Sequence, residues 1–401
     1  MTELRLRDPI HGFVHADPLE AALVGCRPLQ RLRWIHQLGL TFLVYPGAEH
    51  SRFAHVLGAM HLAGRIFDAL VDKRPGLVDV AERPRLRRLV RAAALLHDLG
   101  HAPYSHSAED RFELGIDHEE MTRRLLATEE MAAVFRRHGA GIEAADVAAL
   151  LAGRVPAERR FLAQIVSGEL DVDKMDYLLR DSLFCGVRYG VYDLDRLLET
   201  LVPIVDPENG AVGIGVEEGG VHSAEALVLA RYYMFTQVYF NVTGKALEHH
   251  LTEWLRATGK LWRADPEAFL AEDDATVLAE LRASPHRHAR AVVDRVHFPL
   301  AFETREHLAA AEREEFEAAL PELLESHEPG AILVARSAKD PHRLGPSRVL
   351  VAYPDGRLEP MESASHFIRH LTKIDRYRIY ALPEIRAEVA ERLRQRFPPH
   401  P

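Results

Sequence analysis

The sequence contains very few cysteines and no long apolar run. Only Cys26 and Cys185 occur among its 401 residues, which argues against a disulfide framework and against a metal site built from cysteine thiolates. No stretch approaches the roughly 20 consecutive apolar residues that a membrane-spanning helix needs. Residues 1–5 also lack the basic and apolar regions of a signal peptide. We therefore expect a cytoplasmic protein in which histidine and carboxylate side chains hold any metal ion.

The chain also has fewer basic than acidic residues. It contains 50 lysines and arginines and 60 aspartates and glutamates, so the formal net charge is −10. This balance argues against broad binding to duplex DNA, but a pocket for a small anion needs only local arginine and lysine. A chain of this length exceeds one typical core. We therefore expect a large domain at residues 1–300 and a smaller one at residues 301–401.

The predicted fold is mainly α-helical, because apolar residues recur at helical spacing through most of the chain. Turn and capping residues predict helices from Pro18, from Pro28 to Gly39, and from Ser223 to Thr258. Asn209-Gly210 lies between two short alternating runs and predicts a β-hairpin at residues 202–216. A smaller α+β unit is expected after residue 330, with strands near residues 331–335, 348–361 and 377–381 and helices near residues 363–373 and 384–396.

The stretch at residues 86–106 predicts a helix that ends in a cluster of ligand-type side chains. Its apolar positions share one helical face: Leu86, Leu89, Val90, Ala93 and Leu96. His97 falls on the same face, Asp98 follows it, and Gly100 ends the helix. A buried imidazole needs a partner, and this stretch alone is compatible with either a metal ion or a core histidine bonded to a carbonyl.

Ser51 is a plausible N-cap of a long helix that carries Arg52 and His55 in its first turn. A cation there opposes the helix dipole, which favours a bound anion or a carboxylate partner for Arg52 over an exposed arginine. Further along, His106 and Glu109 lie three residues apart, a spacing that suits a proton donor held by a carboxylate.

A charged face is predicted on a helix that Asp171 caps, with Asp173, Lys174, Tyr177 and Asp181 on one side. Such a run is usually a solvated face, although the phenol makes full exposure less favourable. On the predicted helix 223–258, Arg231 and Tyr239 share a face with aromatic neighbours, which indicates either a pocket wall or a core stripe.

Together, four residues from three predicted helices offer two imidazoles and two carboxylates: His55, His97, Asp98 and Asp173. Mixed nitrogen and oxygen ligands suit iron, manganese, zinc or magnesium, and the residue types alone do not choose among them. The order of these residues resembles the HD-domain phosphohydrolases. More narrowly, it resembles the deoxynucleoside triphosphate triphosphohydrolases of the sterile-alpha-motif and HD-domain protein type, without the sterile-alpha-motif domain.

The resemblance covers roughly residues 4–260 and rests on motifs in a fixed order, among them Asp8-Pro-Ile-His-Gly12, Ser51-Arg-Phe-Ala-His55, His97-Asp-Leu-Gly-His101 and Asp171-Val-Asp-Lys-Met-Asp-Tyr177. It implies that His55, His97, Asp98 and Asp173 hold a divalent metal. It assigns phosphate binding to Arg52, Lys174 and Arg231, with His101 and His118 beside them. The sugar contacts that it implies are Gln37, Leu38, Tyr177, Asp181 and Tyr239, and the proton donor is His106 held by Glu109.

These assignments imply hydrolysis of a deoxynucleoside triphosphate at the α-phosphorus, which yields a deoxynucleoside and inorganic triphosphate. Such a reaction needs an activated water and stabilisation of the charge that builds on the phosphate oxygens. A homo-oligomer, dimer or tetramer, is also implied. Two alternatives stay open: an HD-type enzyme acting on a nucleoside monophosphate or cyclic nucleotide, and a nucleotide-regulated protein that binds single-stranded nucleic acid through a basic groove such as Arg85-Leu-Arg-Arg88.

Guanine nucleotides are expected to activate this protein weakly or not at all. The positions that bind guanine and phosphate at the family's activator site are Leu4 and Gly25 here, and acidic Glu217-Glu218 stands where basic residues would be expected, although Gln30 and Arg33 are kept. Rates of hydrolysis of one dNTP with and without GTP or dGTP test this prediction. A large stimulation would contradict it.

Overall fold

A computed structural model of the chain describes residues 4–105, 111–340 and 349–398. Its contacts define two compact units whose segments alternate along the chain. Unit 1 comprises Met1–Met234, Leu261–Ala275 and His342–His370, and unit 2 comprises Phe235–Lys260, Thr276–Pro341 and Leu371–Pro401. These boundaries differ from the expected division at residue 300, which stays a prediction.

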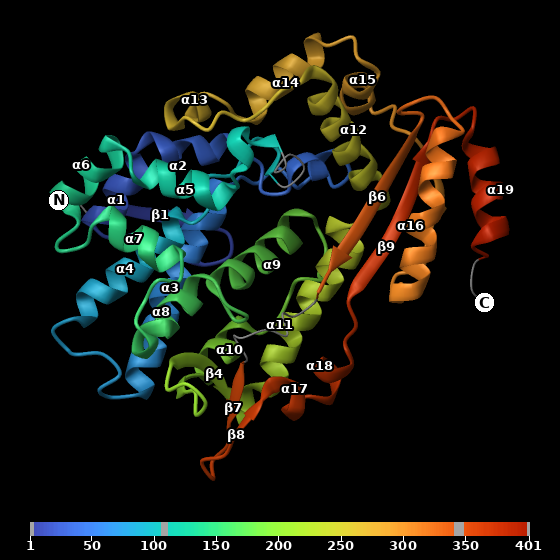
Figure 1. The fold of residues 1–401 in the computed structure, drawn as a ribbon. Coiled ribbons are helices and arrows are strands. Elements are labelled where there is room, and N and C mark those ends of the chain that lie inside the picture. The colour runs from blue at the N-terminus through green and yellow to red at the C-terminus, as the bar shows by residue number, and fades with distance from the viewer. Residues whose placement is uncertain (1–3, 106–110, 341–348, 399–401) are drawn as a thin grey trace. The chain divides into compact units, whose positions relative to one another are not determined.

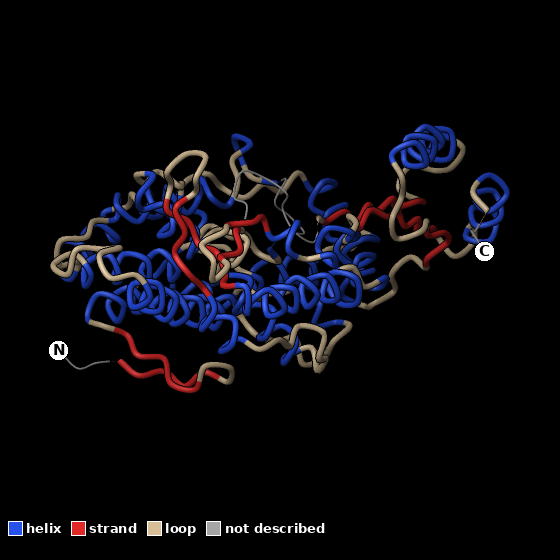
Figure 2. The backbone as a smooth tube through the Cα atoms, turned by 90° about the horizontal axis from the view of Figure 1, so that it is seen from below, coloured by secondary structure: helices blue, strands red, loops and turns tan. Residues whose placement is uncertain are grey.

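Helices make up most of unit 1, as the blue segments of the tube show (Figure 2). In chain order the helices are α1 (Pro18–Gly25), α2 (Arg27–Arg31), α3 (Arg52–Lys73), α4 (Arg83–Leu96), α5 (His118–Leu126), α6 (Glu129–His138), α7 (Ala144–Leu151), α8 (Arg160–Val166), α9 (Val172–Phe184), α10 (Leu194–Thr200), α11 (Val221–Met234), α13 (Pro266–Leu270), α17 (Met361–Ala364) and α18 (His366–His370). The helix α14 (Asp274–Ala283) begins in unit 1 and ends in unit 2. The mainly α-helical fold is therefore confirmed.

The long helix α3 lies at the centre of unit 1 and packs against α4, α8 and α9 (Figure 1). Its apolar face is buried along its whole length, at Phe53, Val56, Met60, Ala63, Phe67 and Leu70. The facing stripe of α4 is buried in the same way, at Leu86, Leu89, Val90, Ala93 and Leu96. Both helices thus follow their apolar periodicity, and their packing fixes the positions of the residues at their ends.

The predicted helix from Pro28 to Gly39 is wrong in its second half. The chain leaves α2 at Arg31 and continues as a 3₁₀ turn, η1 (Leu32–Trp34). The segment after it pairs with residues 50–52, because the amide of Gln37 donates to the carbonyl of His50 at 3.0 Å and the amide of Arg52 to that of Ile35 at 3.0 Å. These long-range hydrogen bonds replace the helical ones.

The predicted helix 223–258 is also interrupted. α11 ends at Met234, a π-helical turn follows (η7, Phe235–Tyr239), and α12 (Val242–Thr258) begins after it. The amide of Phe240 donates to the carbonyl of Phe235, five residues back, at 2.9 Å. The Asn241 side chain then accepts from the amides of Thr243 and Gly244 and caps α12, so the break is built from local hydrogen bonds.

Strands form two sheets in unit 1. β1 (Leu4–Asp8) and β2 (Gly12–Ala16) make an antiparallel hairpin, and the other sheet has the order β3–β4–β7–β8. The hairpin of β3 (Leu201–Val205) and β4 (Val212–Glu217) confirms the Asn-Gly prediction. The second hairpin, β7 (Leu350–Ala352) and β8 (Leu358–Pro360), pairs with it through a parallel contact between β4 and β7. This hairpin therefore belongs to unit 1, not to the separate C-terminal unit in which we expected it.

Unit 2 contains a sheet of order β5–β9–β6 with helices packed beside it. Its elements are α12, α15 (Arg287–Val293), β5 (Leu300–Glu303), α16 (Ala310–Glu325), β6 (Ile332–Lys339), β9 (Ile374–Ala381) and α19 (Arg386–Arg396). Phe302, Phe316 and Ile379 belong to its apolar core. The strand β5 was not predicted, because it lies in a charged region that we expected to be mostly helical. Across the described residues, none of the helices is long and apolar enough to cross a membrane.

Two buried histidines face each other in unit 2. Nδ1 of His250 on α12 lies 2.7 Å from Nδ1 of His288 on α15, and the amide of Phe298 donates to Nε2 of His250 at 3.0 Å. Since Nε2 accepts, Nδ1 of a neutral His250 carries the proton and donates it to His288. Burial, and then the charge of each imidazole's neighbours, lowers the pKa of His250 to about 3 and that of His288 to about 4.

This pair predicts a loss of stability in mild acid. In the unfolded chain both histidines take up a proton below a pKa of about 6.5, whereas in the folded chain they stay neutral until about pH 4. Their contribution is therefore complete above pH 6.5 and is lost as the pH falls toward 4, by about 2 kcal/mol for His250 at pH 5. Urea unfolding at pH 7.5 and pH 5 measures it, with His250→Gln expected to show the smaller pH dependence and His222→Gln, on the surface, the wild-type one. Equal pH dependence in all three proteins would contradict the prediction.

Candidate functional site

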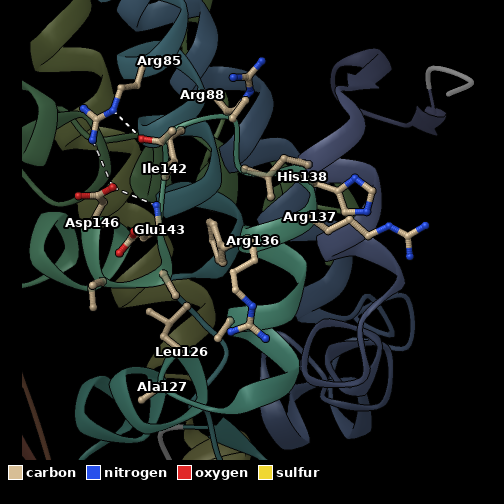
Figure 3. A pocket seen from close by; sticks show the side chains of 18 of the residues that line it. Arg85, Arg88, Leu126, Ala127, Arg136, Arg137, His138, Ile142, Glu143 and Asp146 are labelled. Atoms are coloured by element: carbon tan, nitrogen blue, oxygen red, sulfur yellow. Dashed lines mark hydrogen bonds and ion pairs between the residues drawn. The ribbon is translucent and has the colours of Figure 1, made fainter.

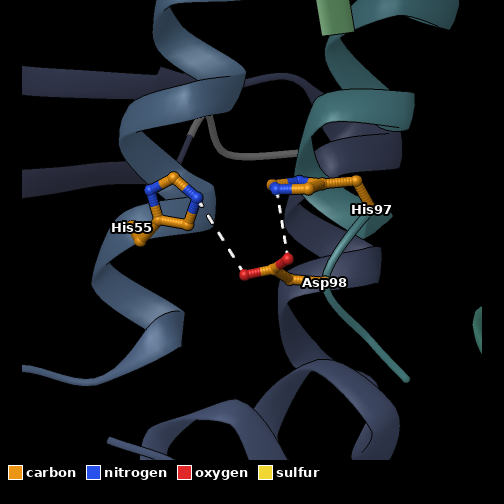
Figure 4. A group of neighbouring side chains, drawn as sticks. All are labelled: His55, His97 and Asp98. Atoms are coloured by element: carbon orange, nitrogen blue, oxygen red, sulfur yellow. Dashed lines mark ion pairs between the residues drawn. The ribbon is translucent and has the colours of Figure 1, made fainter. Parts of the chain in front are cut away.

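Two histidines and an aspartate meet in unit 1 where α3 faces the end of α4 (Figure 4). His55 lies on α3 and is fully buried, and His97 forms the C-cap of α4, with Asp98 next in the chain. Nε2 of His97 is 3.2 Å from Oδ1 of Asp98, and Nε2 of His55 is 4.0 Å from Oδ2 of the same carboxylate. One potential ligand atom from each residue lies within 4.8 Å of the others.

Asp173, on α9, brings a second carboxylate to the same point. Its Oδ1 is 3.1 Å from Nε2 of His55 and 3.7 Å from Nε2 of His97. The Asp173 side chain is 38% exposed, whereas the Asp98 side chain is 8% exposed. The structure thus brings together all four residues that the sequence singled out, and the cluster opens to solvent on the side of Asp173.

Both imidazoles are held with Nε2 facing the cluster. Nδ1 of His55 lies 2.8 Å from a carboxylate oxygen of Asp176, and Nδ1 of His97 lies 2.8 Å from the carbonyl oxygen of Ala94. Both oxygens only accept, so each Nδ1 carries the proton and each Nε2 of the neutral ring keeps its lone pair. Hydrogen bonding of the distal ring nitrogen in this way is typical of metal-binding histidines.

The residues present fit a divalent metal ion. Nε2 of His55 and Nε2 of His97 are buried, yet neither makes a hydrogen bond within the described part of the chain. Burial alone would lower the pKa of His55, but the carboxylates of Asp173 and Asp176 raise it to about 10. The surroundings of Nε2 therefore favour a cation, and nitrogen and carboxylate oxygen are donors that zinc, iron and manganese share.

Asp176 is an important residue that the sequence prediction missed. Besides His55, this buried carboxylate accepts from Nε2 of His11 at 2.7 Å and from Nε and Nη2 of Arg180 at 2.8 Å. Arg180 also donates to Asp8 at 2.9 Å, and Asp8 accepts the amides of the turn that contains His11. Burial would raise the pKa of Asp176, but Arg180 and the two histidines hold it well below its usual value. Its position three residues after Asp173 was the available signal.

A glycine on α3 makes room for this network. A Cβ atom at Gly58 would lie 1.8 Å from Oδ1 of Asp176 and 2.5 Å from Nη2 of Arg180. Contacts this short do not occur between non-bonded atoms, so a side chain at this position would displace the Asp176 carboxylate and the Arg180 guanidinium. The present positions of these two groups, and with them the hydrogen bond to His55, therefore depend on glycine at position 58.

Arg52, in the first turn of α3, has the carboxylate partner that its position suggested. Nη1 lies 2.5 Å from Oδ2 of Asp98, and Nε donates to the hydroxyl of Ser105 at 2.8 Å. His101 lies on the other side of Asp98, with Nε2 3.2 Å from Oδ1, and its ring stacks on that of His118 at 4.3 Å. Asp98 is thus surrounded by positive or donor groups, which hold its pKa well below the usual value although burial would raise it.

Gln37 and Asp181 meet at His50, a residue that the sequence prediction did not single out. Nε2 of His50 lies 2.8 Å from Oδ1 of Asp181, and the His50 carbonyl accepts the amide of Gln37. Oε1 of Gln37 is buried and has no hydrogen-bond partner in the described ranges. Leu38 follows Gln37 and is half-buried. These contacts place polar groups from two segments far apart in sequence beside one another.

The other residues to which the resemblance assigned a role lie in several parts of the structure. Tyr177 is half-buried, and the nearby charge of Arg231 acts on it, although burial is the larger effect and raises its pKa. Nζ of Lys174 donates to Asp171 at 2.6 Å and to the carbonyl of Gly168 at 2.7 Å. Tyr239 lies in the π-helical turn of unit 2, where its ring packs against that of Phe235. His106 and Glu109 lie outside the described residues.

The chain matches two protein families. Residues 52–181 match the HD domain, and residues 192–397 match the HD associated region. A protein of Bacillus subtilis, the uncharacterized protein YwfO, is 40% identical over 257 residues, which are 64% of this chain and 56% of that protein. The deoxynucleoside triphosphate triphosphohydrolase SAMHD1 homolog of Dictyostelium discoideum is 32% identical over 290 residues, 67% of this chain and 53% of that protein. The chain spans about half the length of these curated relatives.

Solved structures resemble the whole chain. A hypothetical protein from Aquifex aeolicus has a TM-score of 0.82 and is 30% identical, over 98% of this chain and 100% of that one. A phosphohydrolase from Bacteroides thetaiotaomicron has a TM-score of 0.75 and is 26% identical, over 95% of this chain and 100% of that one. The two matched families, the relatives and the converging histidines and aspartates together show that this chain belongs to the HD-domain family.

Proposed function

We propose that this protein hydrolyses deoxynucleoside triphosphates to a deoxynucleoside and inorganic triphosphate. The observation that carries the proposal is the convergence of His55, His97, Asp98 and Asp173, with Arg52 bonded directly to one of these carboxylates. A triphosphate carries several negative charges. A divalent metal held by these four residues, beside the buried guanidinium of Arg52, would stabilise them. The name of the Dictyostelium relative supports the same substrate class.

His55, His97, Asp98 and Asp173 would hold the divalent metal. When bound, such an ion lowers the pKa of water and stabilises charge on phosphate oxygens. Arg52 would add positive charge next to the reacting phosphate, while its bond to Asp98 keeps the guanidinium in place. His101 and His118 would lie beside the phosphates, because their stacked rings lie next to Asp98.

Buried polar groups would recognise the sugar. The unpartnered Oε1 of Gln37 and the carboxylate of Asp181, held by His50, are both acceptors for a hydroxyl group. Tyr177, one helical turn from Asp173 on α9, would lie against the sugar ring. Lys174 and Arg231 would bind phosphates, Leu38 would exclude a 2′-hydroxyl, and His106 held by Glu109 would protonate the leaving 5′-oxygen.

The proposed activity is tested with the purified protein, each dNTP and each NTP, and Mg²⁺, Mn²⁺, Fe²⁺ or Zn²⁺ in turn. Mass spectrometry should identify a deoxynucleoside and triphosphate in a stoichiometry of one to one, with dNTPs preferred over NTPs. The variant Asp98→Asn should lose activity by about 10³-fold or more, since it removes a metal ligand and the partner of Arg52. Hydrolysis at the β- or γ-phosphorus, or no turnover of any dNTP with any of these metals, would contradict the proposal.

Asp176 is proposed to position His55 for metal binding. Replacing it with asparagine removes the charge that orients the Nδ1 proton, and the affinity for Mn²⁺ should fall by about 10- to 100-fold. Titration of the metal-free protein with Mn²⁺, followed by electron paramagnetic resonance, measures the affinity independently of turnover. His11→Gln keeps a donor to Asp176 and the Arg180 ion pair, and should stay close to wild type.

The matched control is Asp68→Asn, which removes the partner of Arg87 on the surface of α3. It should leave the Mn²⁺ affinity unchanged. The positioning role would be contradicted if Asp176→Asn bound Mn²⁺ as tightly as wild type, or if its affinity fell only in parallel with thermal stability across all three variants.

A further inference from the structure

A large pocket lies elsewhere in unit 1, beside the N-terminal half of α4 (Figure 3). Its volume is about 1270 Å³, and side chains from α4, α5, α6, α7 and the loop at residues 139–143 line it. None of the four residues of the candidate metal site lines this pocket, and none of the proposed substrate-binding residues does. Arg85 is about 12 residues, or about 18 Å of helix, away from His97. The pocket is therefore separate from the candidate catalytic site.

The lining is strongly basic, in contrast to the acidic chain. Five arginines line the pocket: Arg85, Arg88, Arg123, Arg136 and Arg137. Against them stand the carboxylates of Glu143 and Asp146, whereas the whole chain has a formal net charge of −10. Because like charges repel, a gathering of guanidinium groups in an acidic protein is unfavourable unless an anion compensates for it.

Four of these arginines already pair with carboxylates, and the pairs differ in exposure. Arg85 lies 3.2 Å from Asp146. Arg88 lies 2.7 Å from Asp17 in a half-buried pair, and Arg123 lies 2.7 Å from Glu120. Arg136 pairs with Glu129, and the two side chains are 62% and 81% exposed. Exposed pairs of this kind contribute little to stability, so a multiply charged ligand can take their place. Arg137 makes no ion pair with any residue that the structure describes.

Apolar residues also line the pocket. Leu126, Phe135 and Ile142 are almost fully buried, whereas Ala127 is exposed and Ala132 is half-buried. His138 also lines the pocket, and its Nδ1 is buried without a hydrogen-bond partner among the described residues. A ligand that carries both an anionic group and an apolar or aromatic body would match this combination of guanidinium groups and small apolar side chains.

The same lining argues against a single-stranded nucleic acid as the ligand. Proteins that bind such strands offer aromatic faces on which successive bases stack. Phe135 is the aromatic residue of this lining, and it is only 3% exposed. Arg85 and Arg88 of the basic stretch line this pocket, and the aromatic ring of Phe135 offers almost no surface on which a base could stack.

We propose that this pocket binds a small organic phosphate. The arginines of its lining would take the phosphate group, for which the planar guanidinium is suited, and accessible alanines of the lining, Ala127 and Ala132, would contact the apolar body. The proposal does not depend on the activity proposed above, because the two sites share no residue.

Adenosine 5′-monophosphate is the probe, since it combines a dianion with an aromatic body. Isothermal titration should show binding that weakens with added NaCl, and Arg136→Ala/Arg137→Ala should weaken it by about tenfold or more. The control Arg394→Ala/Arg396→Ala removes two exposed arginines of α19 and should leave the affinity unchanged. Absence of binding at millimolar AMP, or equal affinity in all three proteins, would overturn the proposal.

A second measurement locates the ligand and separates this pocket from the catalytic site. Photolabelling with 8-azido-AMP and peptide mapping should place the label in residues 123–148, and Ala132→Phe, which fills part of the pocket without changing its charge, should reduce it. Label confined to residues 167–188, around the catalytic carboxylate of α9, would overturn the proposal. So would a single-stranded oligonucleotide that binds more tightly than AMP and whose binding the Arg136→Ala/Arg137→Ala variant abolishes.

Discussion

The hydrogen bonds of one buried carboxylate, Asp176, determine the geometry of the candidate site. An isolated charge in the protein interior is costly, and Asp176 is tolerated because Arg180 and two histidines surround it. In return it fixes the proton of His55 on Nδ1, so that Nε2 faces Asp98 and Asp173. The hairpin turn at Asp8, the helix α9 and the helix α3 must all be in place before this arrangement exists. The site is therefore complete only when these three elements of unit 1 are packed together.

Charge is organised differently at the two ends of α4. At its C-terminal end, His97 and Asp98 belong to a cluster in which carboxylates raise the pKa of His55 and in which Nε2 of both histidines is buried without a hydrogen-bond partner among the described residues. At its N-terminal half, Arg85 and Arg88 belong to a basic pocket and have partly exposed carboxylate partners. The first arrangement favours a cation and the second favours an anion. One helix thus carries two sites of opposite charge preference in a chain that is acidic as a whole.

Local patterns predicted the elements that carry the site. The apolar faces of α3 and α4, the cap at Asp171 and the Asn-Gly hairpin follow from spacing and side-chain chemistry, and the structure contains each of them. The helix predicted from Pro28 to Gly39 failed because residues 35–37 pair with residues 50–52. The hairpin of β7 and β8 was expected beside the other C-terminal strands, but β4, more than 130 residues earlier, provides its partner strand. The spacing of apolar residues along the chain does not indicate hydrogen bonds between segments so far apart in sequence.

The sequence by itself determined the family, the mainly helical fold and the four residues that meet at the cluster, because motif order and helical spacing are properties of the chain alone. The tertiary structure decided which atoms of those residues meet. It also revealed the roles of Asp176, His50 and Gly58, which depend on contacts between segments that are distant in sequence. It also gathered arginines from α4, α5 and α6 around one cavity. The residue type determines the charge and shape of a side chain. Its partners depend on tertiary packing, which brings together segments that are distant in sequence.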